Sequence, residues 1–286
     1  MTPESIEAVA KVIGYAGLLV AVGTVGSLWL AHRFERRDDE SLGRFRYALS
    51  TIRVGSSLTV IVALALRAWA HTAAVFSPAV ALMPAHLQTV VIESRWGRGW
   101  QEQAAATLLL ATAAVWNWRA RSTSSTIAAS ITTVAACFVW PQTGHAASQS
   151  IGPLLHGSHL LAAGLWAGTL SSLTLLRYRG HSATTEGLLR AFAPLAGGAV
   201  ALLVFTGIWA MCLYLTRPRD LWTTTYGGLL TAKLAGVVAM GIAGAANWYL
   251  LHRRSKAELS RSLLGEVAIA VIVLVLTGFL TETAHP

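Results

Sequence analysis

The chain has 286 residues, of which 54% are hydrophobic and only 12% are charged, and its formal net charge is +9. Soluble domains usually carry about a quarter charged residues, so this composition excludes an ordinary soluble domain and indicates a polytopic membrane protein. The basic side chains lie in short segments between apolar runs, where they set the orientation of membrane helices. We therefore expect a lipid bilayer as the surroundings and no nucleic-acid partner.

About eight apolar runs are long enough to cross a bilayer, which takes roughly 20 residues of helix. Backbone polar groups must be paired inside lipid, so runs of this length form helices. The predicted fold class is all-α, a polytopic integral membrane bundle. The expected spans cover residues 6–32, 53–76, 101–118, 123–140, 153–176, 192–215, 227–251 and 262–281. We place four helices in an N-terminal part, residues 1–140, and four in a second part, residues 141–286.

The loops between these runs differ in their basic content. The odd-numbered loops carry most of the Arg and Lys side chains, for example Arg33, Arg119, Arg177 and Arg253, whereas the loop at residues 141–152 has none. Cytoplasmic loops are enriched in Lys and Arg. The sequence therefore predicts that the odd-numbered loops are cytoplasmic and that both termini are outside.

Six of the nine histidines fall on the predicted outer side. Three of them, His145, His156 and His159, lie within fifteen positions of one another. A spacing of three puts the last two on one face of a helix, and imidazole is the commonest protein ligand of transition metals. The pattern predicts a metal site in which His156 and His159 share an ion and His145 folds back as a third ligand.

Other residues are candidates for the same chemistry. His71, His86 and Met83 lie on outer segments and are further possible ligands. Sulfur favours Cu(I), and imidazole also suits Cu(II). A path for copper inward from the histidines would involve soft or charged residues of the later helices: Cys137, Met211, Cys212, Met240 and Lys233. Ordinary packing explains each of these residues equally well when it is taken alone.

Charged residues inside membrane helices are expensive and are usually functional. Lys233 lies about two turns into the seventh run, where Glu282 is a plausible partner at similar depth. Asn247 is expected to form a hydrogen bond between helices. No motif for nucleotide binding or hydrolysis is present in the sequence, and we expect a protein that is not an enzyme.

The second part resembles the copper-resistance D (CopD) family of membrane proteins. The resemblance rests on the segment His156-Gly157-Ser158-His159 and the helix that follows it to Gly168, on Thr206-Gly207, and on residues 225–234. It covers roughly residues 142–286, and the first four helices match only in general plan. The sequence departs from the family pattern at Thr169, where a second glycine is expected.

The resemblance implies copper handling in the inner plasma membrane, with uptake from the outside toward the cytoplasm. It also implies a separate periplasmic or extracellular copper-binding protein as donor, and His145, His156 and His159 as metal-facing residues. Two alternatives remain open. One is a haem-binding redox protein in which His71 and His159 ligate the iron, because pairs of histidines on facing helices commonly hold haem. The other is an assembly or sensing protein without transport.

Overall fold

The computed structural model describes residues 2–33, 40–143, 151–215, 217–253 and 256–283. The described residues form helices and no strand, which confirms the predicted all-α fold. The elements in chain order are α1 (Pro3–His32), α2 (Glu40–Phe76), α3 (Pro84–Leu87), η1 (Gln88–Glu93), α4 (Arg95–Ala120), α5 (Thr123–Val139), η2 (Trp140–Gln142), α6 (Gly152–Ala163), η4 (Gly164–Gly168), α7 (Thr169–Tyr178), α8 (Ser182–Tyr214), α9 (Asp220–Thr223), α10 (Thr225–Arg253) and α11 (Lys256–Leu280).

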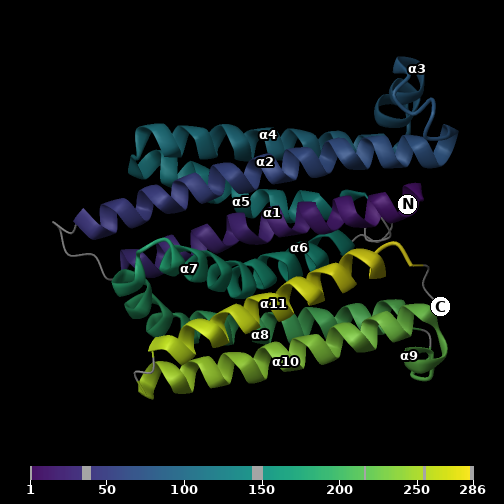
Figure 1. The fold of residues 1–286 in the computed structure, drawn as a ribbon. Helices are drawn as coiled ribbons and strands as arrows, with labels where there is room; N and C mark the ends of the chain where they lie inside the picture. The colour runs from purple at the N-terminus through teal and green to yellow at the C-terminus, as the bar shows by residue number, and fades with distance from the viewer. Residues whose placement is uncertain (1, 34–39, 144–150, 216, 254–255, 284–286) are drawn as a thin grey trace.

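The long helices run nearly side by side along one direction (Figure 1). Among the described residues, seven segments are long and apolar enough to cross a membrane. The eighth long helix, α4, has 26 residues and runs beside α2. It is more polar than the other seven, because its first turns carry Arg95, Arg98, Gln101 and Glu102.

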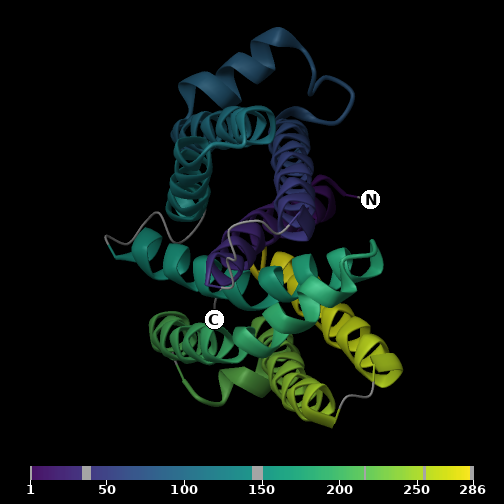
Figure 2. The ribbon, with the colours of Figure 1, turned by 90° about the vertical axis from the view of Figure 1, so that its left-hand side faces the viewer.

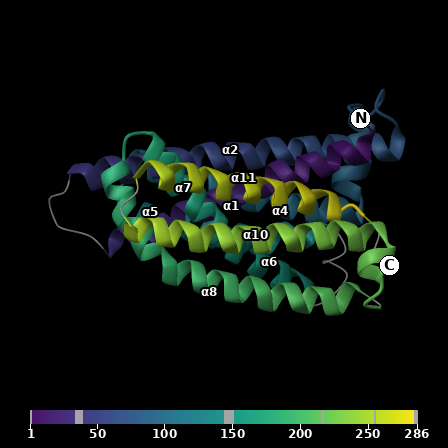
Figure 3. The ribbon, with the colours of Figure 1, turned by 60° about the horizontal axis from the view of Figure 1, so that its bottom comes forward.

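The helices form two groups around α1. On one side, α2 packs along α1, and α4 and α5 complete the first group (Figure 2). On the other side, α10 lies between α8 and α11 (Figure 3). The α6–η4–α7 segment joins the two groups, because it contacts both α1 and α8. The apolar windows of α1 and α2 are half buried or more, whereas those of α8 and α10 are mostly exposed.

A very close approach fixes α1 against the α6–η4–α7 segment. A Cβ atom added to Gly168 would lie 1.8 Å from the carbonyl oxygen of Leu19, and one added to Gly23 would lie 2.0 Å from the backbone of Gly168. Only glycine fits at such a contact, and small residues let membrane helices approach in this way. The π-helical turn η4 occurs at this crossing. Thr169 follows directly, with its hydroxyl facing Gly26.

The start of α1 and the end of α11 lie at one end of the bundle, together with α3 and α9 (Figure 1). We call this the termini end, and the other is the opposite end. The membrane side that each end faces remains the prediction from the Arg and Lys distribution.

Several helices begin earlier than the sequence indicated, most clearly α2, which begins at Glu40 rather than near residue 53. Arg53 was placed at the start of this span, and that prediction is wrong. Its side chain is 0% exposed, and its Nε donates a hydrogen bond to Thr24 Oγ1 at 2.8 Å.

Candidate functional site

Two of the predicted metal ligands, His156 and His159, lie on α6 and both contact α8. His156 Nε2 is 3.0 Å from the hydroxyl oxygen of Tyr214, and His159 Nδ1 is 2.8 Å from Thr206 Oγ1. Gly207 follows Thr206 and faces the same ring, since a Cβ atom there would make an ordinary contact with His159 Cε1 at 3.9 Å. The spacing of three therefore puts both histidines on the face of α6 that meets α8. We refer to these two residues as the histidine pair.

The hydrogen bonds around Thr206 assign the tautomer of His159. Thr206 Oγ1 donates its single proton to the carbonyl oxygen of Leu202, 2.7 Å away. The hydroxyl oxygen therefore accepts from His159, and Nδ1 carries the ring proton. Nε2 of His159 then bears the lone pair, and it has no partner among the described residues. A histidine held at one nitrogen with the other unprotonated is the arrangement that metal-ligating imidazoles adopt.

Residues of α10 complete the surroundings of the histidine pair. Lys233 and His156 both lie within electrostatic range of His159. Tyr226 is buried and interacts electrostatically with Tyr214. It packs in an apolar cluster with Leu230 and Leu280, and Met211 lies against the same cluster. The pair thus sits between α6, α8 and α10, toward the termini end of the bundle.

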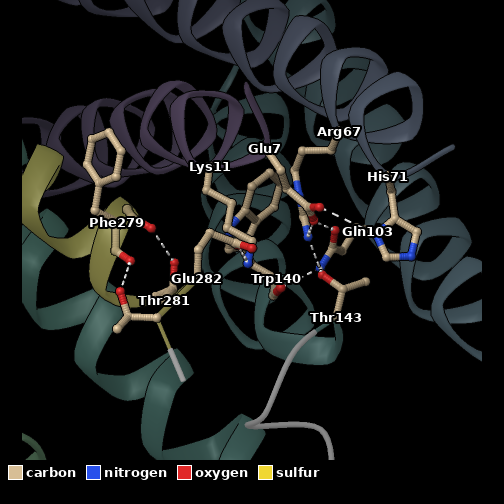
Figure 4. A network of polar contacts seen from close by, with 12 residues as sticks. Glu7, Lys11, Arg67, His71, Gln103, Trp140, Thr143, Phe279, Thr281 and Glu282 are labelled. Atoms are coloured by element: carbon tan, nitrogen blue, oxygen red, sulfur yellow. Dashed lines mark hydrogen bonds and ion pairs between the residues drawn. The ribbon is translucent and has the colours of Figure 1, made fainter. Parts of the chain in front are cut away.

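A second polar region is centred on Arg67, which is 1% exposed (Figure 4). Its Nη1 donates to Gln103 Oε1 at 2.8 Å, and its Nη2 donates to Thr143 Oγ1 at 2.6 Å. Glu7 lies 4.0 Å from Nη2 and also reaches His71 Nδ1 at 3.4 Å. Gln103 in turn donates to the carbonyl oxygen of Trp140 and to Thr143. We call these six residues the Arg67 network: Glu7, Arg67, His71, Gln103, Trp140 and Thr143.

The predicted partnership of Lys233 with Glu282 is wrong. Glu282, just beyond α11, forms an ion pair with Lys11 of α1 instead (Figure 4). This ion pair links the residues just after α11 to α1, close to the Arg67 network. The sequence contained a sign that α1 carries buried charges, because Glu7 and Lys11 interrupt an otherwise apolar run with opposite charges four residues apart. Such a spacing puts both on one helix face.

The other predicted ligands have partners of their own. His71 stacks on Trp96 with ring centroids 4.0 Å apart. His86 stacks on Phe76 at the same distance, and its Nδ1 lies 2.9 Å from the carbonyl oxygen of Val80. Met83 is 53% exposed on the loop beside it. The helix that carries His86, α3, packs against α2 and η1, so the structure does not bring these residues to the histidine pair.

The residues predicted for an inward path are scattered. Cys137 is fully buried in a core cluster with Trp140, and its thiol hydrogen-bonds to its own helix at the carbonyl of Thr133. Cys212 is exposed beside Phe205. At about 100° per residue, it lies on the other side of α8 from Tyr214. Met240 is buried in a core cluster to which both helix groups contribute.

His145 lies outside the described residues, as does His285. Within the described part of the chain, no group of three or more His, Cys, Asp or Glu residues could hold a metal ion. Among the described residues, the candidate metal ligands that lie together are therefore His156 and His159, with Lys233 near them. The sequence did not identify Thr206 and Tyr214 as partners of the pair, because both lie on another helix far along the chain.

The helices and their apolar surfaces define a multi-pass membrane protein. Comparison with known proteins adds a likeness to one family: residues 186–280 match the model of the family described as Copper resistance protein D. The chain is also 26% identical, over 96% of its length, to the Copper transport protein CutJ of Bacillus subtilis (strain 168). It spans about half of that relative, 52%. No solved structure matches the chain. The predicted resemblance to the CopD family is confirmed. The residues that match the family model, 186–280, are fewer than the expected residues 142–286.

Proposed function

We propose that this chain binds copper ions in the membrane and moves them from the termini end of the bundle toward the opposite end. The match to a copper-resistance family and the name of the relative support a copper-related membrane protein. The observation that carries the proposal is His159, whose Nδ1 is held by Thr206 while Nε2 stays open beside His156. Imidazole nitrogen binds copper readily in both common oxidation states.

The first copper site in this proposal is the histidine pair. His145 is the proposed third ligand, because Thr143, two positions before it, is anchored by Arg67 at the termini end. The Arg67 network would then have a positioning role, holding the start of the segment that carries His145. His71, His86 and Met83, at the same end of the bundle, would serve at most as residues along the entry route.

The proposed direction follows from charge. The distribution of Arg and Lys predicts that the termini end faces the outside. A membrane potential that is negative inside favours cation entry by about 2.3 kcal/mol per charge per 100 mV. Copper would therefore move inward without a nucleotide-driven step, as a transported ion rather than a reactant, and the protein would not be an enzyme. A separate copper-binding protein on the outside is the proposed donor, as the family resemblance implies.

Metal content and the visible spectrum of the purified protein test the proposal. We expect copper to co-purify with the wild-type protein and to fall strongly in the double variant His156→Ala/His159→Ala. The matched control is His32→Ala/His181→Ala, which removes two histidines at the opposite end of the bundle. Equal copper in all three proteins would contradict the site. A Soret band that weakens in the first double variant would instead indicate haem.

Uptake into liposomes then tests movement. We expect vesicles that contain the wild-type protein to accumulate copper faster than empty vesicles, and vesicles with His156→Ala/His159→Ala to resemble the empty ones. Binding without any accumulation would restrict the protein to copper capture and would contradict transport.

A further inference from the structure

One face of α10 carries four residues that repeat every seven positions: Tyr226, Lys233, Met240 and Asn247. A helix drifts by only about 20° over seven residues, so the four lie in one stripe along the helix. Lys233 lies within electrostatic range of His159, and Tyr226 interacts with Tyr214, the partner of His156. Met240 is buried in a core cluster that also includes residues of α1 and α2. Asn247 lies closest to the opposite end. We call these four residues the α10 stripe.

The stripe ends at a buried carboxyl group on α11. Asn247 Nδ2 donates a hydrogen bond to Glu266 Oε2 at 2.5 Å. Asn247 is 7% exposed and Glu266 is 2% exposed. Gly244, one turn before Asn247, makes room for the carboxyl group, because a Cβ atom there would lie 3.3 Å from Glu266 Oε1. Asn247 Oδ1 is buried and has no hydrogen-bond partner among the described residues.

Among the described residues, no salt bridge reaches this carboxyl group, and Asn247 is its hydrogen-bond partner. Helix α11 packs against α10, α1 and α7. On α1, Lys11 is paired with Glu282. On α7, Arg177 donates to Ser260, near the start of α11. On α10, Lys233 is fourteen residues from Asn247, which is about 21 Å along a helix.

An uncompensated carboxylate buried in this way would be very unfavourable. The acceptor oxygens around it, from Glu266 and Asn247, are hard ligands that suit Cu(I) poorly. A proton removes this cost. A protonated Glu266 is neutral, and its carboxyl group can still accept the hydrogen bond from Asn247 Nδ2.

We propose that Glu266, held by Asn247, is a proton-binding site at the inner end of the α10 stripe, and that its proton exchanges with the transported cation. The carboxylate takes up one proton when no cation is near. A cation that arrives on the stripe displaces this proton, which leaves Glu266 toward the opposite end of the bundle. The positive charge of the cation therefore replaces that of the proton. The exchange step rests on the proposed copper transport, whereas proton binding by Glu266 does not.

Infrared difference spectroscopy of the lipid-reconstituted protein tests the proton site directly. We expect a carboxylic-acid C=O stretch at neutral pH in the wild-type protein, and we expect it to disappear in Glu266→Gln. The matched control is Glu186→Gln, which alters a partly exposed carboxylate paired with Arg190, and it should keep the band. If Glu266→Gln does not fold, Asn247→Leu should still shift the band to higher frequency through the lost hydrogen bond. A wild-type protein without the band, or a band that neither variant changes, would overturn the proposal.

Addition of copper separates the two proposals. We expect copper to remove the band in the wild-type protein and to leave it in His156→Ala/His159→Ala. A wild-type protein that takes up copper with an unchanged band would overturn the exchange while the proposed transport stands. A band that depends on Glu266 in a protein that neither binds nor accumulates copper would support the proton site and contradict the proposed transport.

Discussion

The Arg67 network and the histidine pair are both polar and both lie toward the termini end, but they differ in how fully their groups are used. Arg67 meets Gln103, Thr143 and Glu7, and its Nε is the guanidinium nitrogen without a partner among the described residues. The network joins α1, α2, α4 and the segment after α5. In the histidine pair, His159 is fixed at Nδ1 by Thr206, while Nε2 has no described partner.

This difference separates two uses of polar groups inside a membrane protein. Buried charges are very unfavourable unless they are paired, so a nearly closed network such as that of Arg67 is explained by the fold that it holds together. A side chain that is oriented at one atom and open at the other is prepared for a ligand. The comparison therefore supports a structural role for the Arg67 network and the proposed binding role for the histidine pair.

The largest expected effect comes from breaking the closed network. Arg67→Met removes the charge that Glu7 faces and leaves Gln103 Oε1 without its donor. Removal of one partner from a buried charge pair typically destabilises a protein by about 3–5 kcal/mol. We expect a clear loss of monodisperse protein after heating in detergent, measured by size-exclusion chromatography.

The control for this experiment is Arg44→Met, which breaks an exposed pair with Glu40 at 2.9 Å. Exposed pairs contribute about 0–1 kcal/mol, so this variant should behave as the wild-type protein does. Equal heat resistance of the two variants would show that the Arg67 network does not hold the fold together. In that case the contrast with the histidine pair would lose its basis.

A smaller effect is expected from the open site. Thr206→Val keeps the shape of the side chain but removes the oxygen that fixes His159 Nδ1. Loss of such a partner of a metal-ligating histidine typically lowers metal affinity about 10–100-fold. We expect a decrease of this size in copper affinity, with heat resistance nearly unchanged, measured by competition with a chromophoric copper chelator.

The matched control is Thr132→Val on α5, whose hydroxyl bonds only within its own helix, to Ala128 at 3.0 Å and Ala129 at 3.2 Å. Copper affinity should not change in this variant. If Thr206→Val also binds copper as tightly as the wild-type protein, the orientation of His159 by Thr206 is irrelevant to binding.

The sequence predicted the helices and the grouping of His156 with His159, because both depend on local patterns of hydrophobicity and spacing. The partners of buried polar groups depend on which helices pack together, and that information is not local. Thr206 and Tyr214 were therefore missed, and Glu282 was assigned to Lys233 instead of Lys11. The start of α2 was predicted wrongly for a related reason. A charged residue at the edge of an apolar run, here Arg53, indicates a helix boundary, but α2 already begins at Glu40.

The smallest expected effect concerns Cys212, which the chemistry of sulfur made a candidate for the copper path. The thiol lies on the exposed side of α8 beside Phe205, Ile208 and Trp209, whereas Thr206 and Tyr214 turn toward α6. A copper ion that moves between α6, α8 and α10 would not meet it. We expect Cys212→Ser to leave both copper affinity and liposome uptake unchanged. A loss of uptake in this variant would mean that copper travels along the outer surface of α8, and the histidine pair would then not be the entrance to the path.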